Sequence, residues 1–438
     1  MEPIRPGEGS RLDALDGLRG FLATMVVFHH CMITVVAPPS FAADPLFWVA
    51  VFSPVHLAWA GTQAVYAFFV LSGFVLMWPH REAIRTQWVP WYVQRLTRLY
   101  LPIWAGAVFS YGVYLCVPRP VRAGMSDWLL LHVGPYSPGD FARDLSLIRY
   151  TDPILNTAYW SLRWEVVYSL LVPLVVAGLL QVRSRFGAFA LAVLLLGLIV
   201  LGADSSGQLR QWDTLRDALI YLPMFFLGAL AAQRAAQIRQ LIHRAERSRG
   251  AITALWVGAI AALLWPLQWQ TAGLLRSLHQ AIAAWGALLL VILFAFSSSG
   301  RRIGQMRVPA WLGERSFSIY LVHGPIVISM AYFLYPGGLP WVMLVTAAPL
   351  AIGVGALFFA CVERPLHAVS RDLGGYVRKR LCAGGQKAVS PPRALNGPSL
   401  SPTACEPGIA TAPETVGTCL ESGDRKSAAS RPAAPGYA

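Results

Sequence analysis

Charged residues are scarce in this chain of 438 residues. They make up 13% of the sequence and hydrophobic residues make up 55%, whereas soluble domains average about 25% charged residues. Apolar runs of about 20 residues, the length that a bilayer core requires, recur between residues 18 and 362. A single soluble core is therefore excluded, and so is a β-barrel, because the runs are continuous rather than alternating. We predict an all-α polytopic membrane protein with about ten transmembrane helices.

Several motifs of well-known enzyme classes are also missing. The six cysteines form no CxxC pair, so we predict neither a zinc site nor a disulfide framework. The sequence contains no GxxxxGK[ST], GxSxG or HExxH, which leaves a nucleotide hydrolase, an elbow-type hydrolase and a zinc protease unsupported. We predict that the protein uses no metal.

Lysine is rare too, so the net charge of +14 comes almost entirely from arginine. The arginines lie between the hydrophobic runs, as the positive-inside rule requires, and this explains the charge better than nucleic-acid binding does. Their alternation from loop to loop indicates that both termini are cytoplasmic. The predicted spans are 18–37, 58–78, 99–117, 158–180, 186–203, 217–233, 251–270, 280–297, 316–335 and 339–362.

This pattern divides the chain into three regions. Residues 1–17 are polar and lack a signal-peptide core, so we expect a cytoplasmic segment that precedes a retained helix. Residues 18–370 form the membrane domain, in which the long loop 118–157 is expected to fold over the outer face. Residues 371–438 are predicted to be a largely disordered cytoplasmic tail, because the chain after about Ala383 is rich in Pro, Ser, Ala and Gly.

The first span carries ionisable residues that are costly in a membrane and are therefore functional candidates. Arg19 and His30 are eleven residues apart, which is close to three helical turns and places them on one stripe, roughly 16 Å apart. Asp16 precedes Arg19 by three residues and can pair with it. His29 lies about 80° away from the stripe. The alternative for both histidines is a structural hydrogen bond to a neighbouring helix.

The fourth span places Glu165 about two turns from its outer end, on one face with Ser161 and Tyr168. A carboxylate at this depth needs a partner, and a histidine paired with it would suit general-base chemistry on a hydroxyl. The alternative is a structural ion pair with Arg163 or another arginine.

Two further spans contribute candidates. Tyr320 and His323 are i, i+3 neighbours in the ninth span, where Pro325 can open the backbone. Arg95 and Arg98 share a face at the start of the third span. They would either serve only to orient the protein in the membrane or bind phosphate groups. The Ser-Gly step in "FFVLSGF" (68–74) favours close helix packing.

Taken in order, these segments resemble the membrane acyltransferase-3 family. The resemblance rests on six blocks that cover roughly residues 11–370: "LDGLRGFLATMVVFHH", "FFVLSGF", "RLTRLYLP", "YWSLRWEVVYSLLVPL", "SFSIYLVHGPI" and "VERPLH". It implies a ten-helix inner-membrane enzyme that moves an acyl group, commonly acetyl, from acyl-CoA to a hydroxyl of a glycan or glycosylated molecule. The family's spacing falls on Arg19 and His30, its paired arginines on Arg95 and Arg98, and its acidic position on Glu165.

The sequence departs from the family pattern at two places. The doubled histidine lets His29 share the role of His30, and Arg163 stands where a small or polar residue is expected. Arg163 could sequester Glu165, although residues two apart do not face each other on a helix.

These observations lead to one prediction and one rival. We predict a bacterial inner-membrane O-acyltransferase in which His30 acts as general base or carries the acyl group, and Glu165 orients it. The acyl-CoA phosphates would be bound by Arg95 and Arg98, with Arg19 deeper and Tyr320 and His323 lining the cavity. Its partners would be acyl-CoA, a hydroxyl-bearing glycan or glycosylated small molecule such as a macrolide, and the lipid bilayer, but no nucleic acid. The rival is a secondary transporter or flippase, which would release no CoA.

Overall fold

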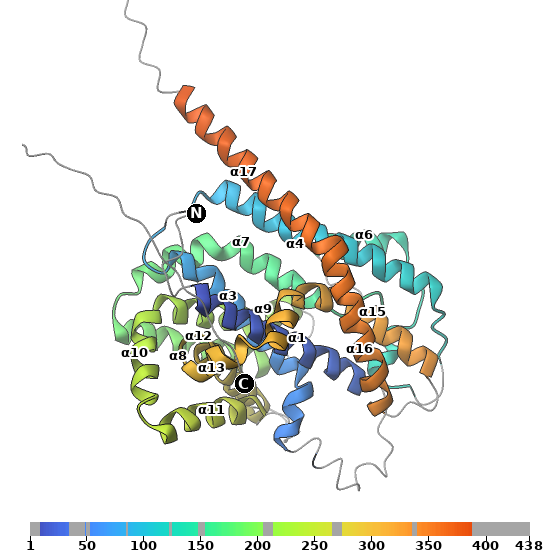
Figure 1. The fold of residues 1–438 in the computed structure, drawn as a ribbon, viewed down its shortest axis with the longest axis horizontal. Coiled ribbons are helices and arrows are strands. Elements are labelled where there is room, and N and C mark those ends of the chain that lie inside the picture. Colours follow the sequence, from blue (N-terminus) through green and yellow to red (C-terminus); the bar gives the residue numbers. More distant parts are fainter. Residues whose placement is uncertain are drawn as a thin grey trace, which may run out of the picture. The chain divides into compact units, whose positions relative to one another are not determined.

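The computed structural model is helical and contains no strand in the part of the chain that it describes (Figure 1). That part comprises residues 9–34, 49, 53–84, 86–121, 125–147, 154–204, 213–264, 274–334 and 340–387. The chain divides into two units, Met1–Lys387 and Ala388–Ala438. The second unit, and with it most of the predicted tail, lies outside the described residues.

Each of the ten predicted spans falls on a helix, which confirms the predicted fold class. Eight helices of the described chain are long and apolar enough to cross a bilayer by themselves. The other two are α11, which has 16 residues, and α1, whose apolar run is interrupted by Arg19 and two histidines. The helices that correspond to the spans are α1 (Gly9–Ile33), α3 (Gly61–Met77), α4 (Trp88–Cys116), α7 (Tyr159–Gln181), α8 (Arg185–Asp204), α9 (Asp213–Gln233), α11 (Arg249–Leu264), α12 (Leu274–Phe296), α15 (Ser316–Leu334) and α16 (Pro340–Phe358).

Shorter elements connect these helices. The long helices expose apolar side chains as well, and on α8 both Phe186 and Phe189 face outward, which suits a lipid-facing surface. The connecting elements are η2 (Pro54–Trp59), η3 (Trp78–His80), α5 (Asp127–Leu130), α6 (Pro138–Ser146), α10 (Ala235–Ala245), α13 (Ser298–Gly304), α14 (Arg307–Glu314), η6 (Phe359–Glu363) and α17 (Arg364–Lys387).

Close glycine contacts fix the position of α1. A Cβ on Gly17 would collide with the backbone of Gly304 in α13, and one on Gly20 would collide with the backbone of α14. In return, a Cβ on Gly313 would meet the main chain of Asp16. The turn that carries Asp16 and Arg19 is therefore held backbone to backbone against α13 and α14.

Helices α3 and α9 cross in the same way. A Cβ on Gly73 would meet the carbonyl oxygen of Phe225, and a Cβ on Gly228 would meet the carbonyl oxygen of Val70. The packing role predicted for the Ser-Gly step of "FFVLSGF" is thereby confirmed. This contact also fixes the rotation of α3, which carries Phe68 and Ser72 on the wall of the site described below.

The C-terminal end of the membrane domain differs from the prediction. The chain runs without a break from α16 through η6, a π-helical turn, into α17, so the boundary placed at residue 370 falls inside a helix. Residues 371–387 are helical because α17 lies along α4 (Figure 1), with Gly374 packed against the side chain of Gln94. A π turn adds a residue to the helical repeat and so rotates the register of the next helix, α17.

The loop predicted over residues 118–157 is partly helical and folds back onto α4. The side chains of Tyr100 and Trp104 donate hydrogen bonds to the carbonyl oxygens of Ser146 and Leu145, each at 3.0 Å. Helix α6 begins at a capping box between Ser137 and Asp140. These contacts hold the loop, and with it the short helix α5, close to the helix bundle.

Candidate functional site

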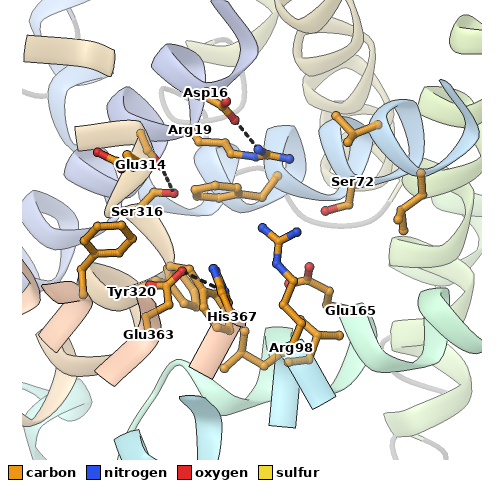
Figure 2. Close-up of a pocket in the computed structure, with 18 of the residues that line it drawn as sticks. Asp16, Arg19, Ser72, Arg98, Glu165, Glu314, Ser316, Tyr320, Glu363 and His367 are labelled. Atoms are coloured by element: carbon orange, nitrogen blue, oxygen red, sulfur yellow. Dashed lines mark hydrogen bonds and ion pairs between the residues drawn. The ribbon is translucent and has the colours of Figure 1, made fainter. Parts of the chain in front are cut away.

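A cavity of about 780 Å³ opens among α1, α3, α4, α7, α14, α15 and α17 (Figure 2). Asp16 and Arg19 lie on one side of it, whereas Arg98, Glu363 and His367 lie on the other. Its apolar wall includes Phe68, Phe69, Leu99 and Phe317. The charged lining residues are Asp13, Asp16, Arg19, Arg95, Arg98, Glu165, Glu314, Glu363, Arg364 and Arg371.

The structure pairs Glu165 with Arg95 rather than with a histidine. The guanidinium of Arg95 donates to a carboxylate oxygen of Glu165 at 2.9 Å and to the hydroxyl of Ser169 at 3.2 Å. The predicted pair of His30 and Glu165 is therefore not formed. Arg163 does not sequester Glu165, because its side chain reaches the hydroxyl of Thr214 at 3.4 Å instead.

Arg19 forms an ion pair with Asp16, as their i, i+3 spacing on α1 predicts. Both side chains line the cavity and stay partly exposed. Two of the predicted arginines, Arg19 and Arg95, thus have a carboxylate partner. The third, Arg98, also lines the cavity.

His30 lies at the other end of α1, where it contacts His323 of α15. The Nδ1 atom of His30 is 2.9 Å from the carbonyl oxygen of Val26 and 3.2 Å from Nε2 of His323. The Nδ1 atom of His323 is 2.8 Å from the carbonyl oxygen of Tyr320. The structure therefore brings together two predicted histidines from segments almost 300 residues apart.

These contacts assign the tautomers of both rings. A carbonyl oxygen only accepts hydrogen bonds, so Nδ1 carries the proton in His323 and also in His30. Nε2 of His323 then carries no proton and accepts from the Nδ1–H of His30, which the carbonyl oxygen of Val26 also accepts. Nε2 of His30 is bare too, and a neutral imidazole with a free Nε2 is the form that a general base needs.

His29 does not share this arrangement. Its Nδ1 lies 3.1 Å from the carbonyl oxygen of Trp59, at the end of η2, and its ring packs against Gly61. The two adjacent histidines point to different neighbours, as expected for residues about 100° apart on a helix. The suggestion that His29 shares the role of His30 thus finds no support in the geometry.

Tyr320 separates the charged cavity from the histidine pair. Its hydroxyl is 2.6 Å from that of Ser161, one turn before Glu165 on α7. Its ring lies 6.0 Å from that of Phe68 and 5.4 Å from that of His323, measured between centroids. Tyr320 lines the cavity, whereas His30 and His323 do not. Ser161, Tyr320 and His323 therefore lie between Glu165 and His30, with hydrogen bonds at the Ser161–Tyr320 and His323–His30 contacts and a ring contact between Tyr320 and His323.

Pro325 leaves one backbone carbonyl of α15 without its helical hydrogen bond, and a side chain from another segment donates to this carbonyl. Pro325 has no N–H to donate to the carbonyl of Leu321, and Nδ2 of Asn156 donates to that oxygen instead, at 2.7 Å. The same Nδ2 reaches Ser110 of α4 at 3.2 Å. Asn156 thus joins α4 and α15 just before α7 begins.

Sequence reasoning missed the contribution of "VERPLH". Glu363, at the end of the π turn, is buried; it accepts from Ser318, and one of its oxygens is 3.4 Å from Nε2 of His367. His367, Arg364 and Arg371 line the cavity with it. The signal that could have found them was a glutamate followed by Arg-Pro directly after an apolar span, in a block that the resemblance already marked.

On the side away from the cavity, His30 contacts α5. Its ring centroid is 5.3 Å from that of Trp128, which is 4.3 Å from that of His132. His132 is buried, with Nδ1 2.8 Å from the carbonyl oxygen of Trp128, and burial lowers its pKa to about 4. His132 is therefore neutral near pH 7, and through this contact the long loop places an aromatic ring against His30.

Among the described residues, no group of three His, Cys, Asp or Glu side chains is placed to hold a metal ion.

Apolar helices around a charged internal cavity define a multi-pass membrane protein with a polar internal site. The chain belongs to the acyltransferase-3 family, whose model, described as an acyltransferase domain, matches residues 12–361. It is 26% identical over 393 residues to "Acyltransferase MdmB" of Streptomyces mycarofaciens, and the match covers 81% of this chain and 91% of that protein. No solved structure matches the chain. The protein is therefore an acyltransferase that transfers groups other than amino-acyl groups.

Proposed function

We propose that the protein transfers an acyl group, in the first place acetyl, from acyl-CoA to a hydroxyl of a carbohydrate-containing acceptor. The observation that carries this proposal is the unprotonated Nε2 of His30, whose ring is held by Val26 and His323 behind Tyr320, a residue of the cavity wall. An imidazole held in this tautomer is suited to take a proton from a hydroxyl. The acceptor would be a surface polysaccharide, a lipid-linked glycan or a glycosylated small molecule such as a macrolide.

In the proposed reaction the acceptor hydroxyl gives its proton to Nε2 of His30 while its oxygen attacks the thioester carbonyl. The carbon–sulfur bond then breaks, and the imidazolium returns the proton to the leaving sulfur, so CoA departs as a thiol and His30 is neutral again. His323 supports the charged imidazolium by accepting the Nδ1–H of His30. Glu165 acts at a distance: it holds Arg95 in place rather than contacting His30.

The proposed orientation puts the cavity at the cytoplasmic side of a bacterial inner membrane, with both termini cytoplasmic. Support comes from the exposed arginines that line the cavity, since basic residues are enriched on the cytoplasmic side of membrane proteins. These are Arg98, Arg364 and Arg371. Acyl-CoA would enter the cavity from the cytoplasm, and its flexible pantetheine arm would pass Tyr320 to reach His30.

The test uses membranes that contain the wild type or the His30→Ala, His29→Ala or Glu165→Gln variant, supplied with radiolabelled acetyl-CoA and cell-derived acceptors. Free CoA and label on lipid-extractable and polysaccharide fractions are followed. We expect transfer by the wild type and by His29→Ala, which is the matched control, and none by His30→Ala. Transfer by a correctly inserted His30→Ala protein would contradict the role of His30. No thioester loss in any sample, with several acyl-CoA donors offered, would favour the transporter or flippase.

A further inference from the structure

The arginines of the cavity fall into two sets. Arg19 and Arg95 are each paired with a carboxylate. Among the described residues, no carboxylate lies within ion-pair distance of the other three: Arg98, Arg364 and Arg371. These three are also exposed while they line the cavity. They are the cations of the cavity that remain available to an anionic ligand.

The fold places these three side chains at one end of the cavity. Arg364, His367 and Arg371 are spaced i, i+3 and i+7 on α17, which puts them on one stripe of that helix. Arg98 stands on α4, one turn after Gln94, the residue against which α17 packs through Gly374. Helices α4 and α17 therefore pack together, and each contributes guanidinium groups to the cavity.

Glu363 and Glu165 are close enough to Arg98 to act on its charge, but within the described residues no carboxylate forms an ion pair with Arg98, Arg364 or Arg371. Glu363 accepts from Ser318 and is close to His367, and Glu314 is bonded to Arg315 at 2.7 Å. Asp13 is exposed on α1, two turns before Gly20. Glu363 ends the π turn and lines the cavity together with the next residue, Arg364, while it accepts from Ser318.

We propose that Arg364 and Arg371 of α17, together with Arg98, bind the phosphate groups of the donor nucleotide. Guanidinium groups recognise phosphate oxygens through paired, charge-assisted hydrogen bonds. Three guanidinium groups that form no ion pair within the described part of the chain match a ligand that carries several phosphates. Arg95 is not part of this phosphate site, since Glu165 already neutralises it. This inference rests on the proposed function, because it assigns the nucleotide to acyl-CoA, and it gives the C-terminal helix a role in binding that donor.

The experiment measures equilibrium binding of radiolabelled acetyl-CoA to the purified full-length protein in detergent at low salt. The test variant is Arg364→Gln combined with Arg371→Gln. The control is Arg380→Gln combined with Arg378→Gln, which removes two positive charges from the same helix at residues that do not line the cavity. We expect the dissociation constant to rise by about tenfold or more in the double variant and to stay unchanged in the control.

A second ligand separates a lost phosphate contact from a misfolded protein. S-acetylpantetheine carries the thioester and the arm of the donor but no nucleotide, so the double variant should bind and use it as well as the wild type does. Wild-type affinity of the double variant for acetyl-CoA would overturn the inference while leaving the proposed function intact. An equal loss of acetyl-CoA and S-acetylpantetheine binding would also overturn it. Absence of acetyl-CoA binding by the wild type would instead reject the proposed donor, and the inference with it.

Discussion

Replacement of His323 by leucine tests whether the histidine pair supports the chemistry. His323 is fully buried, and its Nδ1–H is committed to the carbonyl oxygen of Tyr320, so Nε2 can only accept. Its partner is Nδ1 of His30 at 3.2 Å. Leucine removes this acceptor, while the carbonyl of Val26 still holds the proton of His30 in place. The tautomer of His30 should survive, but the support for its charged form should not.

The size of the effect depends on the charge that His30 gains. A hydrogen bond to a charged group contributes about 1.5–3 kcal/mol, and this contribution is realised only when the imidazolium forms. The expected loss is therefore about 10- to 150-fold in kcat, with little change in KM because His323 does not line the donor cavity. Removal of His30 itself should cost more, since general-base catalysis contributes about 10²- to 10⁴-fold.

The assay is acyl transfer from acetyl-CoA by purified protein, with kcat and KM measured separately. His323→Gln is the informative companion, because its amide oxygen can accept the bond that leucine cannot, and it should recover part of the lost rate. His29→Leu makes the same exchange at the adjacent histidine and should keep the wild-type rate. Thermal unfolding of each variant shows whether the fold is intact.

Two outcomes would refute this reasoning. The first is a His323→Leu enzyme with a kcat within about twofold of the wild type, which is smaller than any charge-assisted hydrogen bond would give. The second is a His323→Gln enzyme that is as stable as the wild type and no faster than His323→Leu. In either case the contact between the two rings would be packing alone.

Three further predictions concern stability. Asn156→Leu should lower the free energy of unfolding by about 1–3 kcal/mol in a denaturation experiment, because the buried carbonyl of Leu321 loses its donor; unchanged stability would mean that water replaces the amide. Gly228→Val should abolish accumulation of folded protein, because the side chain would enter the backbone of α3, whereas Gly178→Val, with nothing within 4 Å, should be tolerated. The pKa of His132 is about 4 in the folded protein and about 6.5 when unfolded, so the unfolded state binds more protons between these values and stability should fall by up to about 3 kcal/mol on acidification from pH 7 to pH 4. Melting curves of the wild type and His132→Gln should therefore diverge over that range, and parallel curves would contradict the burial of His132.

Much of the fold could be predicted from the sequence because its signals are local. A run of about 20 apolar residues crosses a bilayer as a helix whatever its neighbours are, and each predicted span coincides with a helix. The predicted boundary at residue 370 falls inside α17, and the sequence did not indicate this helix. Residues 371–387 are polar by composition, and they are helical because one face of α17 packs on α4, which no local pattern records.

In the candidate site, too, contacts within one helix could be predicted from the sequence and contacts between helices could not. The pair of Asp16 and Arg19 could be predicted because the helical repeat alone brings residues three apart together. The partner of Glu165 could not, because it depends on which face of α7 meets α4. A carboxylate needs some cation or donor, and the sequence offered both histidines and arginines; the packing of α4 beside α7 selected Arg95.

The sequence by itself therefore determined the helices, the membrane they require and the residues that share a stripe on one helix. Family blocks in the sequence also marked His30, Arg95, Arg98 and Glu165 as candidates, though without their mutual contacts. Tertiary structure alone decided the pairing of His30 with His323, the place of Tyr320 between them and the cavity, and the approach of α17 to Arg98. The physical reason is that neighbours along a helix are set by its 3.6-residue repeat. Neighbours between helices are set instead by where backbones touch, and here glycines and one π turn fix those contacts.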